Sequence, residues 1–470
     1  MTSNRPELKR AINRFGFFAL AFGSMIGVGW ITGLKDLFGQ AGPVGTSVAF
    51  LIGGTLMVLI GLCYAEAIQR APVTGGEVAY SYLAFGTGHA FAIGWCLALG
   101  YFAVSAFEAV SIGIVVSYLI NVDYWPLYEF NGSTVFGSHV AIAVVFTLII
   151  ASINHFGVAL ATRAQTVLTF LIVILAAAFV IAGISRGSVT NLTPAFGSTE
   201  MTTALGGLLA VFVTVPFFYV GFDTIPQAAE ERTEDCSTRS LGKMLILSIV
   251  GASLFYAAVF LSVGMATPWQ SITDQPLPTA AAFRQAFDSG FWERVVLLVG
   301  LLGLLTSWNG FFLSGCRVLF SLGRGRIIHP SFGNSHARFG TPTAAIVFGT
   351  ILTIAGATLG KKSVLVFVNV GSLCIALAFL GVACSLAKIR RMDGTQVTGL
   401  RRWLPMIAGA GALFIVAAML VPSSPAVLSW PVEWIVLAVV PLTGIAFWFL
   451  ASKIRLSTDE NTRRELMLGD

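Results

Sequence analysis

Two short stretches place groups that could bind a ligand inside long apolar segments. The first is GSMIGVG at residues 23–29, which holds three glycines, and the second is PFFYVGFDTIPQAAEE, which places Gly221 and Asp223 between two prolines. Glycine lowers helical preference, so the chain can unwind at such a cluster where neighbouring helices protect the freed N–H and C=O groups. Freed amides attract a carboxylate, and freed carbonyls attract a cation or an ammonium group. Both stretches are therefore candidate binding sites.

The glycine cluster has a second interpretation, which its spacing leaves open. Gly23 and Gly27 stand four residues apart, and this pattern of small residues also lets two membrane helices pack closely. On that interpretation the helix is continuous, and the glycines only allow a neighbouring helix to pack closely against it. On the first interpretation the helix is unwound from Ser24 to Gly29, and a half-helix that starts there points its positive end at the ligand.

Acidic residues at membrane depth also indicate chemistry. Glu108 lies well inside the apolar stretch YFAVSAFEAVSIG, where an ionised acid that faces lipid costs about 2.5–3.5 kcal/mol. Its carboxyl must therefore face a cavity or a partner, either as a protonated structural acid or as a proton carrier or contact to a cationic substrate group. We expect Asp223 either to stabilise the helix break or to take part in ion coupling. Glu66 falls near a segment end, where packing or solvation is the expected role.

Composition identifies the elements that hold these residues. The 470-residue chain is 56% hydrophobic and 11% charged, and its mean hydropathy is +0.84, far outside the range of soluble globular proteins. A bilayer-spanning helix needs about 20 predominantly apolar residues. We therefore expect an all-α polytopic membrane protein with 12 transmembrane helices, at about 15–38, 44–69, 87–120, 138–158, 162–185, 202–228, 241–266, 291–320, 342–359, 363–387, 402–421 and 431–452.

The basic residues predict the topology. Twelve spans put both termini on one side, and if that side is cytoplasmic, the opposite side keeps few of the 28 Lys and Arg residues: Lys35, Arg186, Arg284, Arg294, Lys361 and Lys362. This bias explains the net charge of +6, so that charge calls for no nucleic-acid partner. We expect a multi-pass protein of the plasma (inner) membrane with both termini cytoplasmic, as a monomer or homodimer.

The two interrupted segments occupy corresponding places. Each is the first segment of a block of five, so the blocks are expected to be repeats, and because five is odd the second block is inverted in the membrane. Interrupted helices in corresponding positions of two halves are the best sequence pointer to a transporter binding site. The expected division is a cytoplasmic tail (1–14), a first repeat (15–185), a second repeat (202–387), two additional helices (402–452) and a solvated cytoplasmic tail (453–470).

Other classes of site find little support. The six cysteines suit neither a disulfide framework nor a metal site, and no two of the five histidines have the spacing of a metal-binding helix. No nucleophile and base can be assembled at membrane depth, so we expect no enzyme. An ion channel does not require two matched breaks. We expect no cofactor, apart from Na⁺ or H⁺ as a coupling ion.

Five motifs, in order along the chain, resemble those of amino acid permeases of the amino acid, polyamine and organocation (APC) superfamily. They are GSMIGVGW, PVTGGEVAYSYLAFG, NHFGVALATRAQ, FFYVGFDT and TSWNGFFLSGCRVLFSLGR. The resemblance implies the inverted-repeat fold of the leucine-transporter type, with the substrate held between broken helices 1 and 6. It also implies residue roles. The substrate carboxylate meets amides around Ser24, Met25, Gly27, Val28 and Gly29, the amine meets carbonyls around Tyr219 and Gly221, and Phe218, Tyr219 and Phe222 shape the pocket.

The sequence leaves two candidates for the coupling ion, sodium and a proton. Some proton-linked members of the resembled family carry a lysine in the middle of the fifth span, and TVLTFLIVILAAAF has none. Thr306 and Ser307 resemble the hydroxyl pair that completes a sodium site in sodium-coupled relatives, together with the carbonyls of Gly23 and Ile26, since hard cations prefer oxygen ligands. Alternatively, both hydroxyls bond to their own helix. We expect sodium ahead of a proton.

The resulting hypothesis is a secondary active transporter of a small amino acid, driven by an ion gradient through alternating access. Its expected partners are the small-molecule substrate and the lipid bilayer. The alternatives are a carrier of amines such as ethanolamine or a polyamine, with Glu108 and Asp223 as counter-charges, and an amino acid exchanger.

Overall fold

The computed structural model describes residues 5–120, 122–130, 132–275, 277–395, 397–424 and 426–469. Within these ranges, ten helical segments are long and apolar enough to cross a membrane, so the chain is a polytopic membrane protein. They are α1 with α2 (Arg14–Met25 and Gly29–Thr32), α3 (Leu34–Arg70), α5 (Thr87–Leu119), α6 (Gly137–Phe156), α7 (Val158–Arg186), α8 with α9 (Met201–Tyr219 and Thr224–Gln227), α10 (Thr238–Ala266), α12 (Gly290–Arg324), η5 with α14 (Lys361–Ser363 and Val364–Met392) and α16 (Val432–Leu450).

Two shorter apolar helices, α13 (Thr343–Ala357) and α15 (Leu404–Leu420), lie where the other two spans are expected. The connections hold further helices that hydropathy does not indicate: α4 (Gly76–Phe85), α11 (Pro278–Phe287), α17 (Ser452–Ser457), α18 (Glu460–Leu468), and the 3-10 turns η1 (Val189–Leu192), η2 (Ala229–Glu231), η3 (Trp269–Ser271), η4 (Pro330–Gly333) and η6 (Gly399–Arg402). A small antiparallel hairpin of β1 (Pro126–Phe130) and β2 (Ser133–Phe136) precedes α6.

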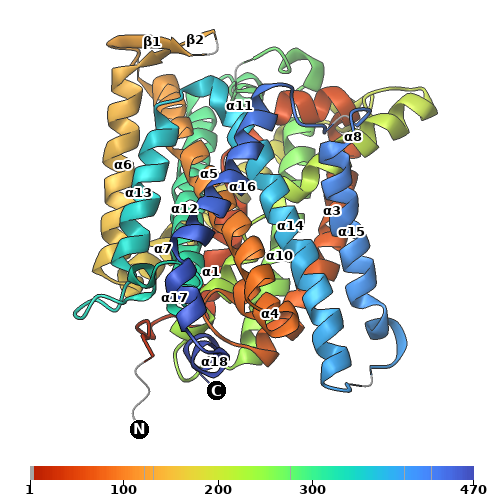
Figure 1. Ribbon diagram of the computed structural model, residues 1–470. Helices are drawn as coiled ribbons and strands as arrows, with labels where there is room; N and C mark the ends of the chain where they lie inside the picture. Colours follow the sequence, from red (N-terminus) through yellow and green to blue (C-terminus); the bar gives the residue numbers. More distant parts are fainter. Residues whose placement is uncertain are drawn as a thin grey trace.

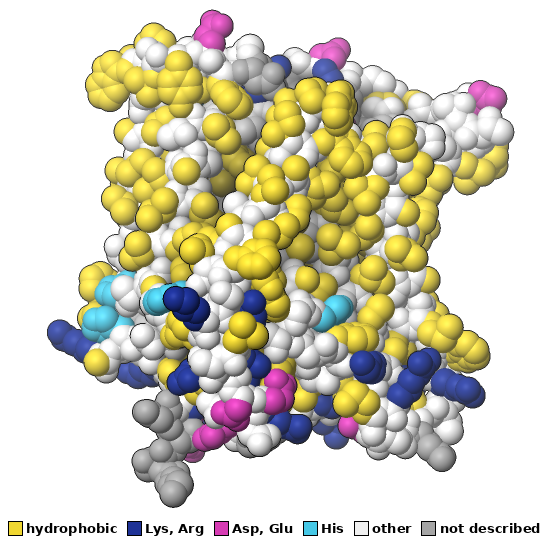
Figure 2. Space-filling model, viewed as in Figure 1, with side chains coloured by type: hydrophobic (Ala, Val, Ile, Leu, Met, Phe, Trp, Pro, Cys, Tyr) yellow, Lys and Arg dark blue, Asp and Glu magenta, His cyan; other side chains and the backbone are white. Residues whose placement is uncertain are grey.

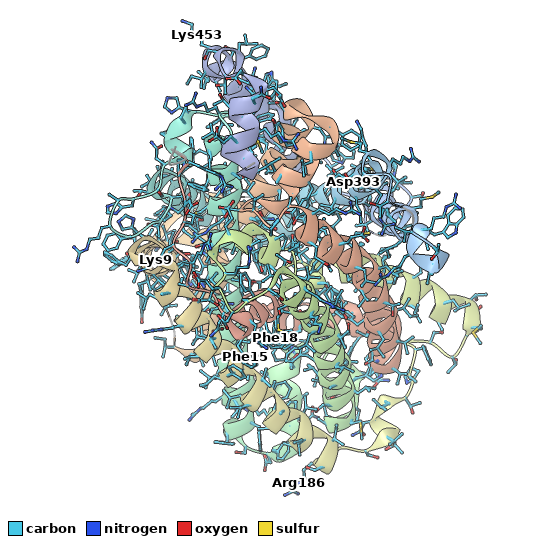
Figure 3. All side chains as sticks on the ribbon, turned by 90° about the horizontal axis from the view of Figure 1, so that it is seen from below. Lys9, Phe15, Phe18, Arg186, Asp393 and Lys453 are labelled. Atoms are coloured by element: carbon cyan, nitrogen blue, oxygen red, sulfur yellow. The ribbon has the colours of Figure 1, made fainter. Side chains whose placement is uncertain are left out.

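The helices form one bundle with distinct ends. Both termini lie at one end, which we call the terminal end, and the β1–β2 hairpin lies at the other, which we call the hairpin end (Figure 1). Figure 2 shows hydrophobic side chains over the middle of the visible face and Lys and Arg gathered towards the terminal end. Seen from below, Phe18 of α1 lies inside the bundle, while Lys453 and Arg186 lie at opposite margins (Figure 3).

A glycine turns the chain between the first two expected spans, 15–38 and 44–69. α3 runs from Leu34 to Arg70 but has a non-helical bend at Gly42, which has a φ of +65°. A Cβ atom at Gly42 would lie 2.4 Å from the backbone nitrogen of Gly197. Only glycine combines this positive φ with such a close approach, and Pro43 then begins the straight part of the helix.

Glycines also set the distance between α1 and α12. A Cβ atom at Gly310 would lie 1.8 Å from Ser24 Oγ, and one at Gly303 would lie 2.5 Å from the Ile26 carbonyl oxygen. The two helices therefore approach until the backbone of the first interruption touches α12. Gly23 plays the same part towards α7, since a Cβ atom there would lie 2.5 Å from Thr169 Oγ1.

The C-terminal tail is packed against the bundle, which corrects the expectation that it is solvated. Met467 of α18 is buried, and a Cβ atom at Gly325 would lie 2.6 Å from its Cγ. Arg5, near the other end of the chain, donates to the carbonyl oxygens of Leu466 (2.9 Å) and Met467 (3.1 Å). Composition does not predict this packing, because α18 is polar on average. The few side chains that hold α18 in place contact residues that are distant in sequence.

An acid between two arginines ties the tail to the helices. Glu230 accepts from Arg324 at 2.7 and 2.8 Å and from Arg5 at 2.6 Å. Burial alone would raise the pKa of Glu230, but the charges of Arg324 and Arg5 outweigh burial and hold this pKa below its ordinary value. The N-terminal segment, η2, α12 and α18 are thus joined at the terminal end.

A fully buried ion pair lies next to this cluster. Arg317 of α12 donates twice to Glu231 of η2, at 2.8 and 2.9 Å, and both side chains are 0% exposed. This two-point contact binds α12 to the segment that follows α9.

We expect Glu231→Gln to lower the free energy of unfolding by about 3–5 kcal/mol, because it leaves the Arg317 guanidinium buried without a counter-charge. The double variant Glu231→Leu/Arg317→Met should recover much of that loss, since it removes both charges together. Thermal unfolding of the purified protein in detergent measures both effects. Lys35→Gln, which breaks the exposed pair with Asp274, is the control and should change little. A single variant as stable as the wild type would contradict this account.

Candidate functional site

The two helix interruptions face each other in the middle of the bundle. α1 ends at Met25 and α2 begins at Gly29, while α8 ends at Tyr219 and α9 begins at Thr224. Gly221 has a φ of +134°, and a Cβ atom on it would lie 2.8 Å from the Met25 backbone nitrogen. The second interruption can therefore touch the first only because residue 221 lacks a side chain.

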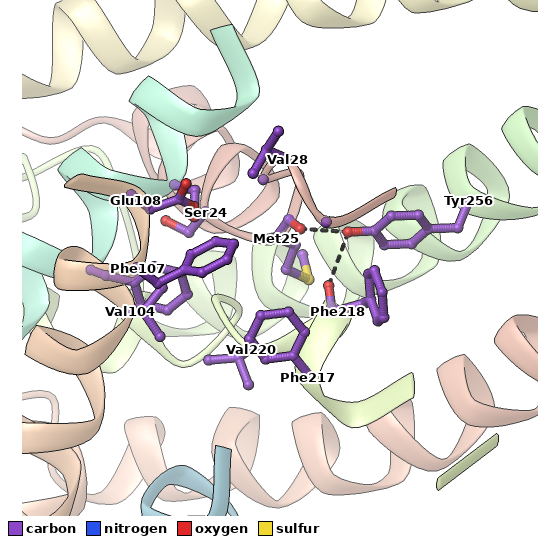
Figure 4. Close-up of a pocket in the computed structure, with 14 residues that line it drawn as sticks. Ser24, Met25, Val28, Val104, Phe107, Glu108, Phe217, Phe218, Val220 and Tyr256 are labelled. Carbon is purple, nitrogen blue, oxygen red and sulfur yellow. Dashed lines mark hydrogen bonds between the residues drawn. The ribbon is translucent and has the colours of Figure 1, made fainter. Parts of the chain in front are cut away.

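A tyrosine of a third helix stabilises both interruptions. The Tyr256 hydroxyl on α10 lies 2.6 Å from the carbonyl oxygen of Met25 and 3.2 Å from that of Phe218, and it shares its hydrogen between them (Figure 4). Each carbonyl stands at the last turn of a half-helix, where the helix itself supplies no amide. The Met25 oxygen also accepts from the Gly27 amide at 3.1 Å. One buried hydroxyl therefore satisfies carbonyl groups on both sides of the site.

A small cavity of about 30 Å³ lies at this meeting point, which is room for about two water molecules. Eight of its lining residues are predicted site residues: Ser24, Met25, Gly27, Val28, Gly29, Glu108, Phe218 and Ser307. The sequence did not single out the other six: Val104, Phe107, Phe217, Val220, Tyr256 and Phe311. Five of the six lie in stretches that were quoted for other residues: Val104 and Phe107 near Glu108, Phe217 and Val220 in the second interrupted stretch, and Phe311 in the motif after Thr306. Tyr256 lies in an apolar stretch that gave no such signal.

Glu108 provides the one carboxyl among the cavity's lining residues. It is 1% exposed and lies beside Ser24, on the side of the cavity away from Tyr256 (Figure 4). A Cβ atom at Gly27 would lie 3.1 Å from Glu108 Oε1 and 3.3 Å from Ser307 Oγ, so these oxygens face the first interruption. Glu108 Oε2 has no hydrogen-bond partner among the described residues. A buried oxygen without a partner marks a place where a proton or a donor group of a ligand can bind.

A second, larger cavity of about 490 Å³ lies directly beside the first. It is lined by the beginning of α3 and by parts of α8, α14 and α15, and α8 lies towards the hairpin end (Figure 1). Phe107, Phe217 and Phe218 line both cavities, together with Gly29 and Val220. Three aromatic rings therefore separate the small cavity from the large one.

Four residues predicted to bind substrate lie outside the cavity lining. The Tyr219 hydroxyl donates to the Phe50 carbonyl oxygen at 2.9 Å, and the Phe222 ring stacks on Phe379 with centroids 5.2 Å apart. Gly221 provides the close backbone contact described above. Asp223 accepts from the Gly221 amide (2.8 Å) and from the Tyr101 hydroxyl (2.7 Å), so its carboxyl stabilises the second interruption.

The predicted sodium ligands lie along the contact between α1 and α12. Thr306 Oγ1 donates to carbonyls of its own helix, at 3.0 Å for Gly303 and 3.1 Å for Leu302, while Ser307 turns towards Glu108 and the Ile26 carbonyl faces Gly303. Donor groups also enter this contact from α7. The Gln165 amide donates to the carbonyl oxygens of Thr306 (3.1 Å) and Ala19 (3.3 Å).

Gln165 belongs to a buried chain of amides that the sequence analysis did not identify. Asn309 donates to Gln165 at 2.8 Å, and Asn154 donates to Asn309 at 2.9 Å. The chain connects α6, α7 and α12 through neutral hydrogen bonds. Asn154 and Gln165 lie at the two ends of the motif NHFGVALATRAQ, so polar residues at membrane depth were the available signal.

Comparison with known proteins gives consistent matches. The model of a family described as amino acid permease matches residues 12–447. The chain is 26% identical over 451 residues to the cationic amino acid transporter 7, chloroplastic, of Arabidopsis thaliana, covering 94% of this chain and 75% of that protein. It is 24% identical over 480 residues to the branched-chain amino acid permease BcaP of Bacillus subtilis (96% and 95%) and 26% identical over 364 residues to the methylthioribose transporter of that organism (72% and 73%).

We expect Tyr256→Phe to lower the free energy of unfolding by about 1–3 kcal/mol, because the buried carbonyls of Met25 and Phe218 both lose the hydroxyl donor, and Met25 keeps the Gly27 amide. It should also speed hydrogen exchange of the amides at residues 24–29, which the tyrosine holds in place. Mass spectrometry after deuterium exchange measures this local effect. Tyr219→Phe is the control, since that hydroxyl bonds outside the interruptions. Equal exchange at residues 24–29 in both variants would contradict the role given to Tyr256.

Proposed function

The chain belongs to the amino acid permease family, and from that premise we propose that it carries a small amino acid across the membrane by alternating access, driven by an ion gradient. The family is the one that the sequence motifs resemble, so that prediction is confirmed, and the chain is an amino acid transporter rather than an enzyme. The substrate, the coupling ion and the transport cycle are parts of the proposal.

The observation that carries the proposal is the small cavity between the two helix interruptions. The backbone amides that begin α2 have no intrahelical partner and stand at the positive end of a half-helix. A substrate carboxylate would accept hydrogen bonds from them, near Val28 and Gly29, while an ammonium group would lie close to the carbonyls around Phe218. Ser24 and Ser307 supply further polar contacts at the cavity wall.

The cavity lining favours a small, apolar side chain. Val104, Phe107, Phe217, Val220 and Phe311 leave about 30 Å³, so even a small amino acid requires the aromatic rings to move, and a larger one requires a greater displacement. The names of the relatives include branched-chain and cationic amino acid carriers and a methylthioribose transporter, so relatives at this level of identity differ in substrate. An amine carrier is the second candidate, because the unpartnered Glu108 oxygen could bind a cationic group.

For coupling, we propose a proton held by Glu108. A carboxyl that is buried at the cavity and has an unpartnered oxygen can alternate between its protonated and ionised forms as water enters. Sodium at Thr306, Ser307 and the carbonyls of Gly23 and Ile26 is the second candidate. We rank sodium lower than the sequence did because the Gln165 amide, a donor, approaches Gly23 and competes with a cation.

The transmembrane arrangement is proposed on the same grounds. α13 and α15 complete 12 spans, the segments at 15–185 and 202–387 form two inverted repeats, and 402–452 adds two helices outside them. The terminal end is proposed to be cytoplasmic because basic residues gather at that end, and the membrane that we propose is the plasma (inner) membrane. The cavity of about 490 Å³ then lies on the outer side of the substrate cavity.

The test of the function is uptake into vesicles that contain the purified chain. Labelled amino acids of small, branched, cationic and acidic types are offered, together with ethanolamine, a polyamine and methylthioribose. Saturable uptake of one small amino acid against its gradient is the expected result. Uptake of amines alone would favour the second candidate, and passive flux without saturation would contradict a carrier.

Gly27→Leu should abolish this uptake, because a side chain at Gly27 extends towards Glu108 and Ser307 and fills the cavity. The matched control is Gly206→Leu, since Gly206 on α8 has open space around it. Both variants should insert and fold, which size-exclusion chromatography verifies before vesicles are made. Wild-type uptake by Gly27→Leu would rule out this cavity as the substrate site.

Glu108→Gln should remove the stimulation of uptake by an inward proton gradient, because an amide neither takes up nor releases a proton. Uptake is compared in acidic and neutral external buffer, with and without sodium, at a fixed membrane potential. The double variant Thr306→Ala/Ser307→Ala should retain proton stimulation. If wild-type uptake instead requires sodium and the double variant loses that requirement, sodium replaces the proton in the proposal.

A further inference from the structure

A second pair of buried acids lies between the second interruption and the terminal end. Glu77 is in the first turn of α4, and Asp223 immediately precedes α9. Both side chains are fully buried, and neither lines the substrate cavity. α4 packs directly on α9, since a Cβ atom at Gly76 would lie 2.5 Å from Pro226 Cβ.

Two polar side chains connect the acids. The Gln227 amide donates to Glu77 Oε2, and it lies 3.3 Å from the Asp223 carbonyl oxygen and 3.5 Å from the Tyr101 hydroxyl. The Tyr101 hydroxyl in turn donates to Asp223 Oδ2 at 2.7 Å. The two carboxyls thus belong to one buried hydrogen-bonded group that runs from the interruption to α4.

Within the described part of the chain, no basic side chain bonds either acid. The titratable groups close to Glu77 are phenols of three helices, Tyr64 of α3, Tyr80 of α4 and Tyr101 of α5, together with Asp223. Charged groups on the elements packed around α4 are engaged elsewhere: Arg317 with Glu231, Arg390 with Glu66, Lys388 over the Phe85 ring, and Glu460 with Tyr82.

Two carboxylates without a counter-ion cannot both stay ionised in such a place. Burial disfavours each charge, and each charge disfavours the other, so such a pair retains a proton and titrates as a unit. Glu77 Oε1 and the Tyr80 hydroxyl have no hydrogen-bond partner of good geometry among the described residues, which leaves room for an added proton on Glu77. Burial, followed by the charge of Asp223, raises the pKa of Glu77 to about 8.

We propose that Glu77 and Asp223 together form a proton-binding site, which holds one proton while α4 and α9 are packed together and releases it to water at the terminal end when they separate. The O–H bond of one carboxylic acid breaks, its electron pair stays on the carboxylate, and water accepts the proton. The link between this release and transport rests on the proposed function, whereas proton binding by Glu77 and Asp223 does not depend on it.

Infrared spectroscopy of the full chain in lipid nanodiscs tests proton binding without a transport assay. In the wild type we expect a carbonyl-stretch band of a protonated carboxylic acid that disappears as the pH rises through about 8. Glu77→Gln should lack this band. Glu66→Gln should keep it, because Glu66 is paired with Arg390 and Arg70. In Asp223→Asn the band should disappear at lower pH, since the repelling charge is gone.

Tyr101→Phe gives a second test that does not alter either acid. Without its hydroxyl, the ionised form of Asp223 loses a hydrogen bond, so the band should persist to higher pH. A wild type without a titrating band, or a band that remains in Glu77→Gln, would overturn the proton-binding site.

The pH dependence of uptake tests whether proton release from Glu77 and Asp223 is linked to transport. Uptake by the wild type should decline at pH values above about 8, and Glu77→Gln should lose this decline. An unchanged pH profile in Glu77→Gln would overturn the link between release and transport. Glu108→Gln should keep the infrared band while losing proton stimulation, so a failure of the proposed coupling at Glu108 is distinguishable from a failure of this site.

Discussion

The structure depends on one constraint: backbone groups freed at membrane depth must find partners inside the protein. Interrupting two helices exposes amides and carbonyls that lipid cannot satisfy, so the interruptions must lie against each other and against other helices. Gly221 lets the second interruption touch the first, and Gly303 and Gly310 bring α12 into contact with it. Tyr256 then satisfies one carbonyl of each. The same arrangement leaves the first amides of α2 beside a cavity, where a ligand can accept the hydrogen bonds that the helix does not.

The sequence predicts the features that depend on local chemistry. Apolar runs predict the membrane-spanning helices, and glycine and proline at two places predict where helices stop, because these residues act through their own backbone. Both interpretations of the glycine cluster describe part of the structure: Gly23 packs against α7, while the chain is unwound from Ile26 to Val28. Glu108 lies buried at the cavity, as the cost of exposing an acid to lipid requires. The motif resemblance identifies the family, which a single physical pattern does not.

Features that depend on distant partners could not be predicted in this way. Tyr256 is one tyrosine in an apolar helix, and its importance comes from two carbonyls that are 231 and 38 residues away in sequence. The burial of Glu77 could not be predicted from its glycine-rich motif, because this burial depends on contacts with Gln227 and α9. The polar tail binds the bundle because Arg5 and Glu230, from two other parts of the chain, gather at α18. Hydropathy averages over such contacts.

Opening the terminal end requires specific contacts to break, and their energies constrain the transport cycle. Arg317 of α12 is bound to Glu231 beyond α9, and separating such a buried pair costs about 3–5 kcal/mol if neither charge finds a new partner. To shift a two-state equilibrium from about 1:99 to about 99:1, a ligand must bind the favoured state about 5.5 kcal/mol more tightly than the other state. One broken pair therefore accounts for most of that quantity. Water that enters as α4 and α9 separate would solvate these charges and the acids beside them, so the ionic contacts and the proposed proton site respond to the same motion.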